Sequence, residues 1–219
     1  LERVRLNYFW PTLVEDVRSF VSNCEICKAI KFPNYQTKVP IGPRKIPTRK
    51  FEVLACDFIS HLPRSKRGNT AIFVVVDLLT KFPFMFAMKQ ADSKNLCHIL
   101  ENIFLTFGCP RELISDNGKQ FLSKLFTDLL AHYKITLTLT PYYHPQANPC
   151  ERVNKVIVTS IRAFHAKFHT EWDENLDAVC AAIRSANHCT TRFSPYLLTF
   201  NQEMYLCGQY NPNSEDTNI

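Results

Sequence analysis

Residues 113–121 read LISDNGKQF, residues 140–162 read TPYYHPQANPCERVNKVIVTSIR, and together these two stretches decide how the chain folds. In the first stretch, the apolar pair Leu113-Ile114 favours a strand that leads to Asp116. The following Asn117-Gly118 pair predicts a turn, because both residues tolerate the backbone angles that tight turns require. The stretch therefore predicts an acidic side chain at the junction between a strand and a turn.

The second stretch contains the start of a long helix. Asn148 is a good N-cap, Pro149 suits the first helical position, and Glu151 stands three residues after the cap. A glutamate at this position commonly accepts a hydrogen bond from the backbone amide of the N-cap residue. Capping is therefore one interpretation of Glu151, and a role in chemistry is the other.

A third acid lies upstream, inside the apolar run FEVLACDFISHL of residues 51–62. Asp57 interrupts this run, and a carboxylate in a largely buried strand needs a cation or several hydrogen bonds. If Asp57, Asp116 and Glu151 converge, their mutual repulsion requires a divalent metal ion, and their oxygen ligands favour magnesium or manganese. Asp77, an acid at the end of another strand-like run, is interpreted instead as a turn residue.

Three motifs carry a resemblance to a known family: CDFISHLP at 56–63, ISDNGKQF at 114–121 and YYHPQANPCERVN at 142–154. Their acids resemble the Asp, Asp, Glu triad of retroviral and retrotransposon integrases, and in particular the gypsy class of long-terminal-repeat retrotransposons. The resemblance extends from YFWP at 8–11 to RFSPYLLTF at 192–200. It implies that the catalytic, metal-holding residues are Asp57, Asp116 and Glu151.

The resemblance implies phosphoryl transfer on DNA with two magnesium (or manganese) ions. Asp57 would bridge both ions, while Asp116 and Glu151 would each hold one. Water would first trim the 3′ end of the element, and the freed 3′-hydroxyl would then attack a phosphodiester of the target DNA. The implied partners are the element ends, the target DNA and further copies of the chain in an active dimer or tetramer.

The order of predicted elements indicates an α/β fold. Three strand-like runs follow Phe51, and helices at 93–107 and about 123–133 then alternate with the Asp116 strand and the run ITLTLT at 135–140. A hairpin meander followed by strand–helix alternation predicts a mixed five-stranded sheet with helices on both faces. The integrases share this ribonuclease H-like fold. The buried stripe of the 123–133 helix is expected to be Leu125, Leu129 and Leu130.

Residues 1–38 are interpreted as a small helical remnant of a zinc module. Their apolar face is expected to be Leu13, Val17, Phe20 and Val21, and the helical pattern ends in the Cys24-x-x-Cys27 pair. Such a pair is half of a zinc site or a redox pair, and no thioredoxin-like strand precedes it. The resemblance implies the second half of a His-His-Cys-Cys site whose histidines would lie upstream of Leu1. Zinc binding is expected only with those histidines, because zinc requires four ligands, and two reduced thiols are the alternative.

The composition indicates a globular and mildly basic chain. Of 219 residues, 46% are hydrophobic and 21% charged, and the net charge of +6 permits a polyanionic partner. The nine cysteines and the absence of a signal-peptide pattern favour a reducing compartment, the nucleus or the cytoplasm. No apolar run is long enough to span a bilayer, so no membrane partner is expected. A basic, proline-rich linker is expected at 39–50, the catalytic core at 51–205 and a polar tail at 206–219.

Three groups of polar residues are candidate DNA contacts. In the loop before the Glu151 helix, rings can stack on bases and amides can bind base edges or phosphates: Tyr143, His144, Gln146 and Asn148. The turn after Asp116 contributes Asn117, Lys119 and Gln120. The polar face of the Glu151 helix carries Lys155 and Arg162, with Arg152 at its edge, opposite an apolar face of Val153, Val156, Ile157, Ile161, Phe164 and Phe168. The alternative is a packed loop and an ordinary solvated helix face.

Two functions from other classes stay open. A domesticated or decayed integrase would bind DNA or chromatin without cutting it. A ribonuclease H-type nuclease would use the same fold and metals to cut RNA in hybrids. The intact triad favours catalysis, and the HPQANPCERVN helix start together with Cys24-x-x-Cys27 favours integrase over nuclease.

Overall fold

The computed structural model describes residues 1–25, 47–140, 150–164 and 170–205. The side chains of residues 2, 3, 6, 151, 152, 163 and 164 lie outside this described part. Two short N-terminal helices, α1 (Glu2–Asn7) and α2 (Leu13–Asn23), precede the α/β core. In the described residues, no helix is both long and apolar enough to cross a membrane.

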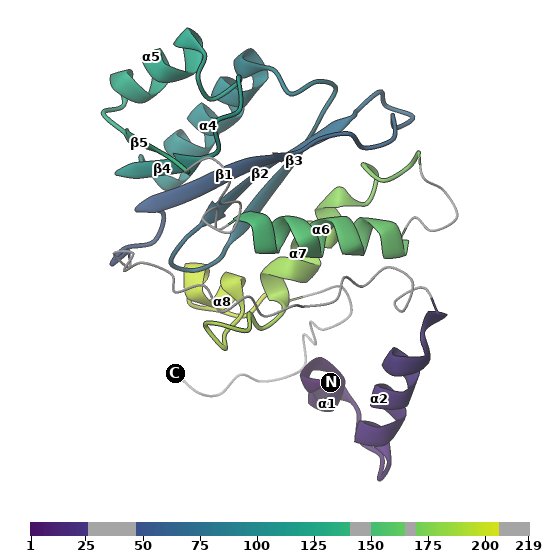
Figure 1. Ribbon diagram of the computed structural model, residues 1–219. Coiled ribbons are helices and arrows are strands. Elements are labelled where there is room, and N and C mark those ends of the chain that lie inside the picture. Colours follow the sequence, from purple (N-terminus) through teal and green to yellow (C-terminus); the bar gives the residue numbers. More distant parts are fainter. Residues whose placement is uncertain (26–46, 141–149, 165–169, 206–219) are drawn as a thin grey trace.

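The core is built on one mixed sheet of five strands in the order β3-β2-β1-β4-β5 (Figure 1). The antiparallel part is made by β1 (Val53–Ile59), β2 (Ala71–Asp77) and β3 (Pro83–Met88), which are joined by short connections. The strands β4 (Glu112–Ser115) and β5 (Thr136–Leu139) continue the sheet parallel to β1. Parallel neighbours require long crossovers, which here contain helices. The predicted mixed five-stranded sheet is therefore confirmed.

Helices cover both faces of the sheet. On one face, α4 (Ser93–Phe107) and α5 (Lys124–His132) pack on a core that includes Leu54, Cys56 and Phe73. On the other face, α6 (Cys150–Phe164) and α7 (Leu176–Ser185) pack on a core that includes Val53 and Ala55. A short last helix, α8 (Pro195–Phe200), follows α7 and contacts it. Neighbouring residues of β1 alternate between the two cores, as the pleat of a strand requires.

The helix boundaries follow the sequence signals closely. The side chains of Asp92 and Ser123 accept hydrogen bonds from backbone amides in the first turns of α4 and α5. At the other end of α4, Gly108 has a φ of 93°, a conformation that favours glycine and ends the helix. The predicted span of 93–107 is thus confirmed by residues that cap it.

Three predictions about buried helix faces are wrong in detail. In α5, Phe126 and Leu130 face the sheet, and Leu125 is 51% exposed, because the stripe starts one residue later than predicted. In α6, Val153, Ile157 and Ile161 are buried at a spacing of four, which leaves Val156 49% exposed on the flank. In α2, Leu13 is buried, whereas Phe20 and Val21 are exposed and no described element packs on that side. Phe168 lies outside the described residues, as does the side chain of Phe164.

Asp77 has the structural role that its position predicted. Its buried carboxylate accepts hydrogen bonds from the backbone amide of Thr80 (3.0 Å), the hydroxyl of Thr80 (2.7 Å) and the amide of Phe51 (3.1 Å). Phe51 has a φ of 57°, which is unfavourable for a bulky residue. Asp77 therefore ties the β2 turn to the strained residue that precedes β1.

The segment 170–174 holds the β1–β2 connection against the start of α7. The Trp172 indole N–H donates to the Pro63 carbonyl at 2.7 Å, and this tryptophan is almost fully buried. The Asp173 carboxylate accepts from the Ser65 hydroxyl at 2.7 Å and from the Asn69 amide at 2.6 Å. The hairpin end is therefore anchored through side chains and not only through the sheet ladder.

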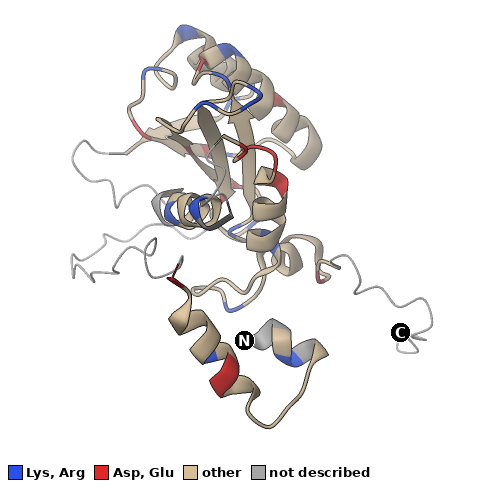
Figure 2. Ribbon diagram, turned by 90° about the vertical axis from the view of Figure 1, so that its right-hand side faces the viewer, with Lys and Arg blue, Asp and Glu red and all other residues tan. Residues whose placement is uncertain are grey.

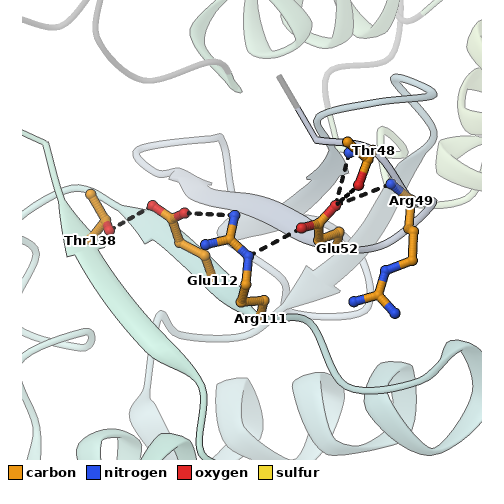
Figure 3. Close-up of polar contacts among 6 residues, drawn as sticks. All are labelled: Thr48, Arg49, Glu52, Arg111, Glu112 and Thr138. Carbon is orange, nitrogen blue, oxygen red and sulfur yellow. Dashed lines mark hydrogen bonds and ion pairs between the residues drawn. The ribbon is translucent and has the colours of Figure 1, made fainter. Parts of the chain in front are cut away.

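A polar network joins the amino-terminal ends of β1 and β4 (Figure 3). Glu52 accepts from the backbone amides of Thr48 (2.8 Å) and Arg49 (3.1 Å) and from Arg111 Nε (3.1 Å). These backbone hydrogen bonds, together with the side chains of Thr48 and Arg111, lower the pKa of Glu52 to about 2. The same network continues from Arg111 to Glu112 on β4. It fixes the point at which the chain enters the sheet.

Candidate active site

The first acid, Asp57, lies on β1 on the face that α6 covers. Val53, Ala55 and Ile59 share that face and belong to the core beneath α6. The Asp57 carboxylate is half-buried, and its Oδ1 accepts from the backbone amide of Phe58 at 2.8 Å. The polar interruption of this apolar strand thus faces the start of a helix.

The second acid, Asp116, directly follows β4. Ala55 of β1 pairs with Ile114 of β4 in a parallel register. Extending this register by two residues brings Asp116 level with Asp57, and neighbouring strands lie roughly 4.8 Å apart. Sequence distance hides this juxtaposition, which the strand order creates.

Gly118 holds the Asp116 carboxylate in a tight turn. The Gly118 amide donates to Asp116 Oδ1 at 3.0 Å. A Cβ at position 118 would lie 3.0 Å from that oxygen and 3.1 Å from Gln120 Oε1. The sequence indicated a turn at this position, whereas only the structure shows that the turn orients the acid.

The third acid, Glu151, lies in the first turn of α6. Three residues later, Asn154 Nδ2 donates to Asp57 Oδ2 at 2.8 Å and connects the helix to β1. Residues three apart share one side of a helix, so Glu151 belongs to the side of α6 that faces Asp57. Its own side chain is outside the described part. Among the described side chains, no group of three His, Cys, Asp or Glu is placed to hold one metal ion.

Sequence reasoning missed Asn154. The available signal was its spacing of three from Glu151, which places both residues on the same helix side. Its second polar atom, Oδ1, is buried and accepts no hydrogen bond from any described residue. Buried acceptors are usually satisfied, so this atom marks an incomplete polar site.

Two buried thiols flank the acids in the sequence. Cys56 precedes Asp57 and Cys150 precedes Glu151, and both side chains are fully buried. Burial is the largest cause of a raised pKa at both thiols, and the charge of Asp57 raises each pKa further. Both thiols therefore stay neutral and add no negative charge beside the carboxylates.

The proposed DNA-contact residues are only partly within the described structure. Asn117 Nδ2 donates to the Thr140 carbonyl at 2.7 Å, so this amide links the turn after β4 to the end of β5. Lys119 is exposed and Gln120 is half-buried in the same turn. Lys155 and Arg162 are exposed on α6, a helix that carries basic residues in Figure 2. The other candidates lie outside the described residues or side chains: Tyr143, His144, Gln146, Asn148 and Arg152.

The proposed zinc ligands are likewise only partly described. Cys24 is half-buried and directly follows α2, where the chain leaves the helix in an extended conformation. Cys27 lies outside the described residues. The predicted half site therefore stays a prediction.

Two family models match the sequence. The integrase core domain matches residues 47–145, and the integrase zinc binding domain matches residues 1–32. Among similar curated proteins, the Pro-Pol polyprotein of feline foamy virus is 30% identical over 203 residues, which are 91% of this chain and 17% of that protein. The transposon Tf2-3 polyprotein of Schizosaccharomyces pombe is 27% identical over 192 residues, 86% of this chain and 14% of the polyprotein. The chain thus spans about a sixth of these relatives or less.

Solved structures share the fold. The intasome of simian T-cell lymphotropic virus, in complex with a PP2A regulatory subunit, contains a chain with a TM-score of 0.65 and 17% identity; the match covers 90% of this chain and 70% of that one. The HTLV-2 integrase catalytic core domain in complex with magnesium, in its trimeric form, has a TM-score of 0.55 and 16% identity, over 67% of this chain and 94% of that one. The mixed five-stranded sheet with flanking helices is therefore the ribonuclease H-like fold.

Proposed function

The chain belongs to the integrases of retroviruses and retrotransposons, and we propose that it is a polynucleotidyl transferase that processes DNA 3′ ends and joins them to target DNA. The observation that supports this activity best is the juxtaposition of Asp57 and Asp116 on neighbouring parallel strands. The Asn154 hydrogen bond to Asp57, one turn after Glu151, adds the start of α6 to the same place.

The residues present fit a divalent metal site. Two carboxylates at one level of adjacent strands would repel each other strongly without a cation between them. Their oxygen donors suit magnesium or manganese, and the partnerless Asn154 Oδ1 is an acceptor suited to a coordinated water. Asp57, Asp116 and Glu151 would hold the two ions. When bound, such ions stabilise the attacking and the leaving oxygen of an in-line displacement at phosphorus.

The contribution of the chain itself is to orient groups. The Phe58 and Gly118 amides fix one oxygen each of Asp57 and Asp116. In 3′ processing, a water oxygen bonds to phosphorus and the 3′-oxygen of the element leaves as a hydroxyl. In strand transfer, that hydroxyl bonds to a target phosphorus and the 3′-oxygen of the target strand leaves. Lys155 and Arg162 would bind phosphates beside the acids and position the DNA.

Further parts of the proposal concern the setting of the reaction. A gypsy-class element, element ends and target DNA as substrates, and a homo-oligomer as the active form follow from the family. The titles of the structural neighbours, an intasome and trimeric and dimeric core domains, support an oligomer. We place the reaction in the nucleus, where target DNA lies. Zinc would bind Cys24 and Cys27 only together with two histidines from a preceding segment.

The experiment compares two activities of the same protein. Strand transfer of labelled oligonucleotide ends and cleavage of RNA in an RNA–DNA hybrid are measured side by side in magnesium and in manganese. We expect strand transfer, and we expect Asp57→Asn, Asp116→Asn and Glu151→Gln each to abolish it. Circular dichroism should show an intact fold in all three variants. The exposed Asp128→Asn on α5 serves as the matched control.

Each alternative has its own outcome in this experiment. Hybrid cleavage without strand transfer would identify a ribonuclease H-type nuclease. DNA binding without either reaction would identify a domesticated or decayed integrase. Near wild-type strand transfer in any one of the three acid variants would remove that residue from the catalytic set.

A further inference from the structure

We propose that Asn154 is a positioning residue of the acidic site: one end of its carboxamide fixes the Asp57 carboxylate, and the other accepts a hydrogen bond from a water on the bound divalent ion. The inference rests on the proposed function, because it deepens the description of the same site. It starts from two observations on one side chain, a short hydrogen bond and a buried atom without a partner.

The hydrogen bond fixes which way the carboxamide points. A carboxylate only accepts hydrogen bonds, so the amide nitrogen of Asn154 must face Asp57 Oδ2, at 2.8 Å. The oxygen Oδ1 of Asn154 must then point the other way. That oxygen is buried and has no hydrogen-bond partner among the described residues. The side chain is therefore half satisfied, with its acceptor still available beside an acid.

The chemistry of the site indicates what completes this pair. A buried acceptor without a donor is unfavourable and rare in folded proteins. Magnesium retains several of its waters when proteins bind it, and those waters are strong donors. Residues that orient metal ligands in this way usually contact both the ligand and its surroundings. A coordinated water is thus the donor that the position next to Asp57 would provide.

The position of Asn154 on α6 gives the contact a second consequence. Asn154 and Glu151 are three residues apart on the same side of the helix. On the buried side of this helix, Val153 and Ile157 pack on the sheet. A hydrogen bond from Asn154 to Asp57 therefore sets the height of the first turn of α6 above β1. This contact positions the helix that carries the third acid relative to the first.

Metal binding, measured without any DNA, tests the inference. The dissociation constant of Mn²⁺ is measured by calorimetry and by electron paramagnetic resonance for the wild-type chain and for Asn154→Ala. Loss of a residue that orients a ligand typically weakens metal binding roughly 10-fold to 100-fold, and we expect a weakening in this range. Asn102→Ala is the matched control, because Asn102 is an exposed asparagine on α4 whose amide contacts only His98 Nε2 at 3.3 Å among the described residues. Its dissociation constant should stay within about twofold of the wild-type value.

A second variant keeps the shape of the side chain. Asn154→Asp replaces the donor that faces Asp57 by a like charge, which a bound cation would screen. We expect the melting temperature of the metal-free variant to fall at pH 7.5. We also expect saturating Mn²⁺ to raise it by more than it raises the wild-type value. This measurement does not require Asn154→Ala to fold.

The outcomes separate this inference from the function on which it rests. If wild-type protein binds Mn²⁺ and Asp57→Asn does not, the acidic site exists. Unchanged Mn²⁺ affinity in Asn154→Ala would then show that Asn154 is only a structural link between α6 and β1, and so would an unchanged Mn²⁺ effect on Asn154→Asp. If the wild-type chain itself binds no Mn²⁺, the proposed metal-dependent function fails together with this inference.

Discussion

At the scale of single residues, close approach explains positions that composition does not. Gly118 has no unusual backbone angle, yet a side chain there would press on the Asp116 carboxylate and on Phe121 Cδ2, 3.4 Å away. The glycine is required by the space beside the acid. Asp77 shows the opposite case, an acid whose buried oxygens are occupied by backbone and hydroxyl donors.

Replacing Asp77 should destabilise the fold without a direct effect on the reacting groups. Asp77→Ala removes three buried hydrogen bonds and leaves the Phe51 and Thr80 amides unsatisfied, so we expect a loss of about 2–4 kcal/mol in the free energy of unfolding. Urea unfolding measures this loss. The control is Asp92→Ala at the N-cap of α4, which should cost about 1 kcal/mol. Equal losses in the two variants would contradict the central role of Asp77.

At the scale of elements, α6 connects the sheet to solvent. Its buried side carries Cys150, Val153, Ile157 and Ile161 on the sheet, and its flank carries the half-exposed Val156. Lys155 and Arg162 are exposed and lie seven residues apart, which is roughly 10 Å along the axis. A helix that starts at the third acid and continues with exposed cations is suited to follow a phosphate backbone.

The double variant Lys155→Ala with Arg162→Ala should weaken DNA binding equally for all sequences. Each lost phosphate contact releases about one counterion fewer, so the slope of log affinity against log salt should flatten by about two. Circular dichroism should be unchanged, because neither residue is buried. Fluorescence anisotropy at several salt concentrations gives the slope. An unchanged slope would assign the DNA path to another surface, such as the basic residues Arg49 and Lys119.

At the scale of the whole molecule, the two ends of β1 have different roles. Its carboxyl half carries Asp57, whereas its amino-terminal end is held by the Glu52 network of Figure 3. The hydrogen bonds to Glu52 join the residues just before β1 to Arg111, just before β4. The strands that carry both aspartates are thus held together at the far end from the acids.

This network predicts an acid-dependent loss of stability. The Thr48 and Arg49 amides lower the folded-state pKa of Glu52 to about 2 from an ordinary value of 4.5. A lowered folded pKa stabilises the fold above the ordinary value, and the contribution disappears as the pH falls from 4.5 towards 2. The difference in melting temperature between wild type and Glu52→Gln should therefore be largest above pH 5 and shrink in acid. A constant difference at all pH values would contradict this, and Asp128→Asn is the control.

The sequence predicts the fold better than it predicts the site. Periodicity and caps predict the sheet and the helix from 93 to 107, because local signals such as Asp92 and Gly108 act on their own neighbours. The level of Asp57 with Asp116 depends on strand order, and the Asn154 contact depends on helix–sheet packing. Neither is encoded in local spacing. Leu125 and Val156 were assigned to the wrong sides for a related reason, since adjacent leucines or valines leave the phase of a stripe ambiguous.

The burial of Trp172 gives the molecule a built-in optical probe. The chain has two tryptophans, and the other, Trp10, lies between α1 and α2 with its indole N–H on the Asp16 carboxylate. A tryptophan shielded from water emits at shorter wavelength than a hydrated one. In a Trp10→Phe background, the emission colour would therefore come from Trp172 alone. Because its indole is bonded to Pro63, that colour would follow the docking of residues 170–174 onto the β1–β2 hairpin in real time.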